Sequence, residues 1–331
     1  MTPSAFQDER PSAPLGVVWD PDPTCNLSCR HCATPRGHHA QADWRGVHGA
    51  IMAAAPFFVS LGGGEPLLDL ERTLAIVDGF GAGGIRINLT TNATLVNAAV
   101  ARALAARKAF LKVTVSIEGG SARGHEAIRG VGTFQQALRG LEHLVAVGLD
   151  LSLAATVTRD TVAELPAAAV ELAARWGVHH VKLARLKPVG RGMTVFRDAA
   201  CTPAELQALF LRCLTCDGPD RPVRIEISDP LTALLPSGTG GGCPAGRVLA
   251  YVSPDGRCTP CPFWMHPFGR LPEDRLVTCW QRMGTFLEGL APPPPCRDCT
   301  VVARCGGGCP GIFDGPAGID PQCPRLAVAG P

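Results

Sequence analysis

The sequence of 331 residues lacks an excess of charge of one sign, because 31 basic residues balance 29 acidic ones and the formal net charge is +2. Such a balance gives no electrostatic footprint for a nucleic-acid backbone or an anionic membrane, so we expect neither as a partner. The first residues lack a basic segment followed by an apolar one, and no run of about eighteen apolar residues occurs. We therefore expect a cytoplasmic protein. Because 46% of the residues are hydrophobic, the chain can bury a real core, which excludes disordered and coiled-coil chains.

Cysteine is absent from residues 33–200, although the chain holds 15 cysteines. Three of them occur by residue 32, and the others lie at or beyond Cys201. A cytosolic compartment keeps thiols reduced, so a cysteine-rich chain without an export signal is expected to bind metal rather than to form disulfides.

The cysteine-free stretch alternates short aliphatic segments with amphipathic ones. Strands are expected over residues 16–20, 57–61, 85–89, 111–117, 151–157 and 178–184, and helices over residues 41–54, 69–80, 94–107, 133–147 and 161–176. Asp69, Thr133 and Thr161 are the expected capping residues of three helices. Strands that alternate with helices form right-handed βαβ units on a parallel sheet. We expect an α/β core of six units over residues 16–190, preceded by an extension over 1–15.

The composition changes after residue 184. A segment rich in Pro, Gly and basic residues leads to an expected helix over 203–213, and Gly, Pro and Cys dominate from residue 238. Such a segment has too few apolar residues for an ordinary core and needs a metal or disulfides to stabilise it. We place a linker over 191–237 and a metal-stabilised C-terminal domain over 238–331.

Cys25, Cys29 and Cys32 form a C-x3-C-x2-C spacing in the loop after the first expected strand. Three thiolates on one loop can hold three irons of a [4Fe–4S] cluster and leave the fourth iron open to a substrate or cofactor. A zinc knuckle is the alternative. Zinc sites usually use two C-x2-C pairs, and no second pair lies nearby in the sequence.

This spacing after the first strand resembles the radical S-adenosylmethionine (radical SAM) superfamily, and a second motif extends the resemblance. The second expected strand leads into Gly62, Gly63, Gly64 and Glu65, which are similar to the family's GGEP motif. The glycines let a ligand approach the backbone closely, and Glu65 offers a carboxylate to a cation. The resemblance implies that this cation is the ammonium group of SAM.

Three further segments match the family in order. Thr91–Leu95 resembles a TNG-type turn, and the segments 115–119 and 125–130 resemble the stretch written SLDG…H…IRG, with Glu118 in place of the more frequent Asp. The resemblance implies that Ser116 contacts SAM and that Arg129 binds its carboxylate. An exposed arginine with no such role is the alternative for Arg129.

The C-terminal cysteines resemble the SPASM domain, which holds two auxiliary [4Fe–4S] clusters. Cys243 is followed by Gly256 and Cys261 at the spacing C-x12-G-x4-C, and the later cysteines follow C-x2-C-x5-C-x3-C, a gap and a final C. The resemblance implies a distal cluster on Cys296, Cys299, Cys305 and Cys323, and a proximal cluster on Cys243, Cys261 and Cys309.

The proximal set lacks a fourth cysteine, because none lies in the few residues before Cys243. Either one iron stays open, or one of Cys258, Cys213 and Cys216 completes the set. Cys201 and Cys279 have no place in the pattern, and we expect them to be buried free thiols.

The resemblance implies a partial (β/α)6 TIM-like barrel with a small cysteine-rich C-terminal domain. It also implies an enzyme that uses SAM, one SAM-binding [4Fe–4S] cluster and two auxiliary clusters to form a 5′-deoxyadenosyl radical. The segment from Cys243 to Arg247 is similar to the mycofactocin type of precursor-peptide maturase. This favours a ribosomally made peptide as the substrate, modified by oxidation, crosslinking or decarboxylation. A flavodoxin or ferredoxin is the expected electron donor. Because Cys25 lies near the N-terminus, a separate leader-peptide-binding protein is expected too.

Two alternatives remain. The same radical chemistry could modify a small molecule, such as an aminoglycoside or another sugar, by epimerisation or dehydrogenation. A non-catalytic iron–sulfur carrier or a zinc-stabilised binding protein is the other alternative. The turn at Glu65 argues against the second one, because a carrier needs no site for the SAM ammonium group.

Overall fold

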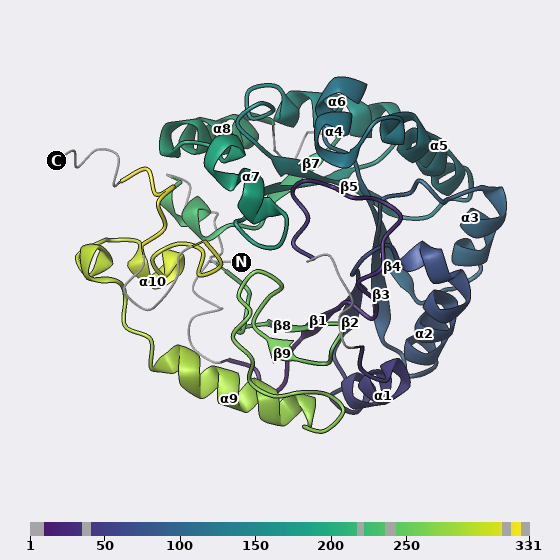
Figure 1. The fold of residues 1–331 in the computed structure, drawn as a ribbon, viewed down its shortest axis with the longest axis horizontal. Helices are drawn as coiled ribbons and strands as arrows, with labels where there is room; N and C mark the ends of the chain where they lie inside the picture. The colour runs from purple at the N-terminus through teal and green to yellow at the C-terminus, as the bar shows by residue number, and fades with distance from the viewer. Residues whose placement is uncertain (1–9, 35–40, 217–221, 236–242, 313–318, 326–331) are drawn as a thin grey trace.

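A computed structural model describes residues 10–34, 41–216, 222–235, 243–312 and 319–325. Over these residues the chain builds one curved sheet in the order β7-β6-β5-β4-β3-β2-β1-β8-β9 (Figure 1). Neighbouring strands pair in parallel from β7 to β8, and β9 pairs with β8 antiparallel. The strands are β1 (Gly16–Trp19), β2 (Phe58–Leu61), β3 (Arg86–Thr91), β4 (Phe110–Ser116), β5 (Leu151–Val157), β6 (His180–Arg185), β7 (Arg224–Ile227), β8 (Leu249–Val252) and β9 (Cys258–Thr259).

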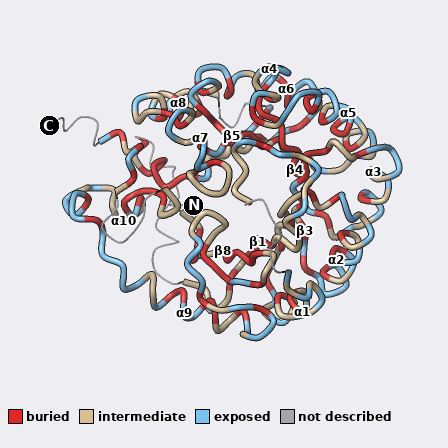
Figure 2. Tube along the Cα trace, in the orientation of Figure 1, coloured by how far each residue is buried: buried red, intermediate tan, exposed pale blue. Residues whose placement is uncertain are grey.

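Helices surround the outer face of this sheet (Figure 1). Buried residues follow the strands and the helix faces that pack on them, whereas the outward helix faces are exposed (Figure 2). The helices are α1 (Trp44–Ala53), α2 (Leu70–Ala82), α3 (Ala98–Ala105), α4 (Ala122–Arg129), α5 (Thr133–Ala146), α6 (Leu165–Arg175), α7 (Gly192–Ala199), α8 (Pro203–Cys216), α9 (Leu276–Glu288) and α10 (Val302–Cys305), with short 3-10 turns η2 (Pro66–Asp69), η3 (Pro230–Leu234) and η4 (Pro294–Cys296).

The two faces of the sheet differ in polarity, because successive side chains of a strand point to opposite faces. The outward residues are apolar and join the hydrophobic core, as Trp19 does when its ring packs edge-on against Phe80 of α2. The inward residues are largely polar: Asn88 donates to Ser60 at 3.4 Å, and the hydroxyls of Thr114 and Ser152 lie 2.8 Å apart. The inner face of the sheet is therefore hydrophilic.

The predicted α/β core with a parallel sheet is confirmed, and the sheet extends further than predicted. β7 lies in the segment expected to be a linker, and β8 and β9 lie in the expected C-terminal domain, yet all three join the same sheet. The domain boundaries themselves stay predictions. Helix α4 was not predicted.

The expected caps had mixed outcomes. Asp69 caps α2 by accepting a hydrogen bond from the Arg72 amide at 3.0 Å, as predicted. The predictions for the other two were wrong. Thr133 is the first residue of α5, whose cap position is Gly132 and makes no side-chain bond, and Thr161 precedes α6 by four residues. None of the helices in the described ranges is both long enough and apolar enough for a bilayer crossing.

Candidate functional site

The loop that carries Cys25, Cys29 and Cys32 follows β1 and is held by the glycine turn after β2. The amides of Gly64 and Glu65 donate to the carbonyls of Asp22 and Thr24, each at 2.8 Å. A Cβ atom on Gly64 would collide with the backbone of Thr24. The chain itself therefore requires glycine here, because its own cysteine loop packs against the turn.

The three thiols of the loop lie close enough to influence one another. Burial raises the pKa of Cys25, and the charges of Glu65, Cys29 and Cys32 raise it further. Burial likewise raises the pKa of Cys29, and the Arg129 guanidinium opposes this shift from 4.0 Å. The structure thus brings the predicted triad together.

This donor set fits a [4Fe–4S] cluster, which takes one thiolate for each iron and is bound by cysteine. Within the described ranges, no three His, Cys, Asp or Glu side chains converge on the position of a single metal ion. Arg191 closes the loop from the other side: its Nε donates to the Cys29 carbonyl at 2.8 Å, and its amide donates to the Cys32 carbonyl at 2.9 Å.

Glu65 is buried beside the triad, and its carboxylate is fixed from three directions. Thr91 Oγ1 and the Leu67 amide donate to Oε1 at 2.7 and 3.1 Å, and the Asn92 amide donates to Oε2 at 2.8 Å. Burial raises the pKa of Glu65, and these bonds oppose the shift. A carboxylate offers about four acceptor positions, so room for one further donor, such as an ammonium group, is left.

Ser116 and Arg129 take different positions. Ser116 is the buried last residue of β4, at the same end of the sheet as the cysteine loop. Arg129 ends α4 and forms a buried ion pair with Glu118, to which its Nε and Nη2 donate at 2.8 and 2.6 Å. Glu118 therefore occupies two of the donors that were predicted to bind a carboxylate of SAM.

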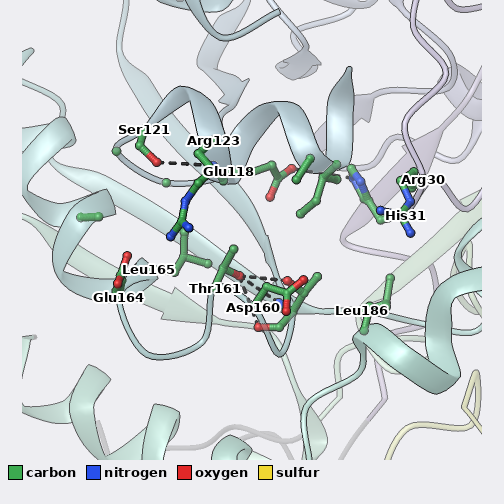
Figure 3. Close-up of a pocket in the computed structure, with 18 of the residues that line it drawn as sticks. Arg30, His31, Glu118, Ser121, Arg123, Asp160, Thr161, Glu164, Leu165 and Leu186 are labelled. Atoms are coloured by element: carbon green, nitrogen blue, oxygen red, sulfur yellow. Dashed lines mark hydrogen bonds and ion pairs between the residues drawn. The ribbon is translucent and has the colours of Figure 1, made fainter. Parts of the chain in front are cut away.

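A cavity of about 790 Å³ opens beside the cysteine loop (Figure 3). His31 and Leu186 line one end, and Glu164 and Leu165 at the start of α6 line another. His31 Nδ1 is buried and has no hydrogen-bond partner among the residues described, which suits a ligand at that end. The glycine turn itself does not line this cavity.

The structure also brings the predicted proximal cysteines together. Burial raises the pKa of Cys243 to about 11 and that of Cys261 to about 12. The charge of Cys309 contributes to both increases. The charge of Asp229 also raises the pKa of Cys243, and the charge of Lys187 lowers it. These three thiols therefore lie close enough for their charges to affect one another.

The predicted distal cysteines form a second group. Burial raises the pKa of Cys296, and it raises that of Cys305 to about 12. The charge of Cys323 contributes to both increases. The charge of Cys299 also raises the pKa of Cys296, so Cys299 belongs to the same group. The structure therefore places the members of each expected set near one another, and their roles as cluster ligands stay predictions.

Cys258, one candidate for the missing proximal ligand, is engaged elsewhere. It lies on β9 with no exposed surface and shares a side-chain hydrogen bond with Cys279 of α9. The groups that act on its pKa are Cys279 and Asp274, not the proximal thiols. Cys201 and Cys213 are buried in the hydrophobic core.

Two polar clusters were missed in the sequence because they join distant segments. Tyr251 of β8 donates to Asp20 at 2.7 Å, and Arg185 of β6 pairs with Asp229 and Asp320. An isolated Asp or Arg carries no local pattern that indicates its partner.

Family models match both parts of the chain. The model of the radical SAM superfamily matches residues 21–172, and the model of SPASM, an iron–sulfur cluster-binding domain, matches residues 243–300. The structure resembles that of SuiB from Streptococcus suis bound to S-adenosylmethionine, with a TM-score of 0.76 and 17% sequence identity over 94% of this chain and 77% of that one.

Two curated relatives match almost the whole chain. The mycofactocin maturase MftC of Mycolicibacterium smegmatis is 31% identical over 94% of this chain and 83% of its own length. The PqqA peptide cyclase of a Methylobacterium species is 28% identical over 96% of this chain and 84% of its own length. The chain belongs to the radical SAM superfamily and carries a SPASM domain. It is an enzyme whose cofactors are SAM, a [4Fe–4S] cluster and auxiliary clusters.

Proposed function

We propose that this enzyme modifies a ribosomally made precursor peptide, and that the modification is oxidative. The similarity to MftC along 94% of the chain carries this proposal, and the similarity to a PqqA peptide cyclase supports it. The hydrophilic inner face of the sheet suits a peptide, whose backbone needs hydrogen-bond partners throughout.

Cys25, Cys29 and Cys32 are the proposed ligands of the SAM-binding cluster. When bound, this cluster and SAM supply a 5′-deoxyadenosyl radical that removes a hydrogen atom from the substrate. Glu65, held by Thr91 and Asn92, offers its free acceptor position to the SAM ammonium group.

The other contacts to SAM are proposed at the glycine turn and at two neighbouring strand ends. Gly62, Gly63 and Gly64 fix the position of the cysteine loop relative to Glu65. Ser116 lies at the end of β4, and Arg129 keeps one guanidinium nitrogen, Nη1, near Cys29. His31 and Leu186 line the cavity end that would receive the adenine ring.

The proposed proximal cluster uses Cys243, Cys261 and Cys309, and the proposed distal cluster uses Cys296, Cys299, Cys305 and Cys323. The surroundings of Cys258 favour a proximal cluster with three cysteine ligands and one open iron. A flavodoxin or ferredoxin as the electron donor, a separate leader-peptide-binding protein and a cytoplasmic location complete the proposal.

The experiment uses anaerobically reconstituted enzyme with SAM and a reductant. We expect release of 5′-deoxyadenosine, and a mass change in a short peptide encoded beside the gene when that peptide and its binding protein are added. Release of 5′-deoxyadenosine without any change in the peptide would contradict the peptide substrate and turn attention to sugars. No release from fully reconstituted enzyme would contradict both.

A further inference from the structure

Tyr251 and Asp20 form a hydrogen-bonded pair on the inner face of the sheet. Asp20 follows β1, and Tyr251 lies on the neighbouring strand β8, where it is paired in register with Val18. Trp19 points outward to the helices, and the flanking residues of Tyr251, Ala250 and Val252, are in the core. Strand alternation therefore places Asp20 and Tyr251 on the hydrophilic inner face of the sheet.

Asp20 differs from the other carboxylate of its loop. Asp22 is paired with Arg72, whose Nη2 donates to it at 2.6 Å. No cation pairs with Asp20 within the described ranges, and Tyr251 supplies the one hydrogen bond to its side chain there, at 2.7 Å to Oδ2. Asp20 is partly buried. Removing a carboxylate from water without a cation costs free energy, so such a group is a candidate for function.

Burial also makes Asp20 a group that exchanges its proton near neutral pH. It raises the pKa of Asp20 to about 6, and the hydrogen bond from Tyr251 opposes this shift. The pKa of Tyr251 is raised by burial and then by Asp20, Asp255 and Cys261, so its hydroxyl stays protonated and remains a donor.

The pair lies near two parts of the proposed catalytic machinery. A Cβ atom on Gly62 of the glycine turn would approach Asp20 Oδ1 to 2.9 Å. Cys261 of the proximal set is close enough to Tyr251 for its charge to raise the pKa of the tyrosine. A substrate that is reached by both the radical and an auxiliary cluster has to come close to this pair.

We propose that Asp20 is the catalytic base that takes the proton lost by the substrate during oxidation, and that Tyr251 is the positioning residue that holds its carboxylate. This inference rests on the proposed function of the enzyme. It assigns a role to two residues outside the cysteine and glycine motifs.

The step balances as a two-electron oxidation of the substrate. One C–H bond breaks as a hydrogen atom leaves and gives 5′-deoxyadenosine. The substrate radical then loses one electron to a one-electron oxidant of the iron–sulfur class and one proton to Asp20 Oδ1, as a double bond or a crosslink forms. Asp20 becomes a neutral carboxylic acid and returns its proton to water before the next turnover.

The first test uses the fact that Tyr251 is the only tyrosine of the chain. Ring-labelled tyrosine therefore gives one C–O band in isotope-edited infrared spectra of the holoenzyme. We expect this band to shift with a midpoint near pH 6, as Asp20 gains its proton, and to stay constant in Asp20→Asn. A wild-type band that does not change between about pH 5 and pH 8 would overturn the proposal.

The second test separates proton transfer from radical formation. In Asp20→Asn we expect hydrogen transfer from deuterated peptide into 5′-deoxyadenosine to continue, while product falls about 100-fold. Loss of 5′-deoxyadenosine in this variant would show that Asp20 binds SAM instead and would overturn the proposal. If the wild type itself forms no product from the peptide, the proposed function fails, and the infrared result on the pair still stands by itself.

Tyr251→Phe distinguishes a positioning role from a purely structural one. Product formation by the wild type should fall as the pH drops through about 6, because the protonated carboxyl cannot act as a base. Without the hydrogen bond the pKa of Asp20 rises, so this limb should move to higher pH in Tyr251→Phe. A lower rate with an unmoved limb would contradict the positioning role. Asp78→Asn is the matched control, because this exposed carboxylate pairs with Arg107 on the outer surface.

Discussion

Arg185 Nη1 donates to Asp320 Oδ1 at 3.0 Å, and this ion pair joins the end of β6 to the segment that leads into Cys323. Both side chains have at most 1% of their surface exposed. Asp320 also accepts a hydrogen bond from the amide of Cys309 at 2.9 Å. The barrel sheet and the cysteines proposed for both auxiliary clusters are therefore connected through one buried carboxylate.

Removal of the arginine should destabilise the fold and the distal site together. Arg185→Met leaves Asp320 with no cation partner in the part of the chain that the structure describes, whereas Asp229 keeps its ion pair with Lys187. Breaking one side of a buried ion pair costs about 3–5 kcal/mol. We expect the free energy of unfolding to fall by that amount in anaerobic urea titrations, with loss of about four irons per chain.

Arg107→Met is the matched control for this experiment. Arg107 forms an exposed pair with Asp78, and such pairs contribute about 0–1 kcal/mol. A loss of stability in Arg185→Met no larger than in Arg107→Met would contradict a structural role for the buried pair.

Cys258 provides a second prediction, on the composition of the proximal cluster. The thiol of Cys258 is hydrogen-bonded to Cys279 in the core. Cys258→Ala should therefore keep the full iron and sulfide content and lose only about 1 kcal/mol of stability. Cys243→Ala should lose the iron of one cluster. If Cys258→Ala loses as much iron as Cys243→Ala, then Cys258 is the fourth ligand and the open iron is excluded.

The strands of the core were predictable because each combines a short aliphatic run with turn residues at its end. Five of the six expected strands begin within one residue of the observed ones, and the expected strand at 178 begins two residues early. Helix α4 was missed because its sequence is polar and only His125 and Ile128 of it are buried. β8 carries the same signal, a short apolar run over Leu249–Val252, but it was missed because Gly, Pro and Cys dominate the residues around it.

The expected grouping of the cysteines came from the resemblance to the SPASM domain, and the structure places the members of each group near one another. Contacts between single residues far apart in the chain could not be predicted. Asp20 and Tyr251 are separated by 231 positions, and Arg185 and Asp320 by 135. Nothing near either residue in the sequence indicates which partner the fold brings to it, because the pairing depends on the order of strands in the sheet.

The three loop cysteines should differ from the auxiliary cysteines in a SAM cleavage assay. Substitution of Cys25, Cys29 or Cys32 by Ala is expected to abolish release of 5′-deoxyadenosine, because the SAM-binding cluster is lost. Cys296→Ala and Cys305→Ala should retain part of this release and form no product. Cys296→Ala or Cys305→Ala could also abolish release of 5′-deoxyadenosine while their spectra show an intact SAM-binding cluster. That result would contradict this division of roles.

His125 makes the stability of the enzyme sensitive to mild acid. Its Nδ1 accepts a hydrogen bond from the Glu118 amide at 3.1 Å, so the folded protein requires neutral imidazole. Burial, and then the charge of Arg129, lowers the pKa of His125 to about 4 from the ordinary value of 6.5. The stabilising effect is complete above pH 6.5 and is lost as the pH falls from 6.5 toward 4, because only the unfolded chain then binds the proton.

His125→Asn measures this contribution, because an Asn side-chain oxygen can accept the same hydrogen bond and cannot be protonated. The lost packing against Phe134 lowers the stability of the variant by a similar amount at every pH. Between pH 7 and pH 5 the wild type should lose about 2 kcal/mol more of its free energy of unfolding than the variant does. Urea titrations with the iron content checked at each pH provide the measurement. Parallel pH profiles for the two proteins would mean that His125 is protonated in the folded state, contrary to the bond from Glu118.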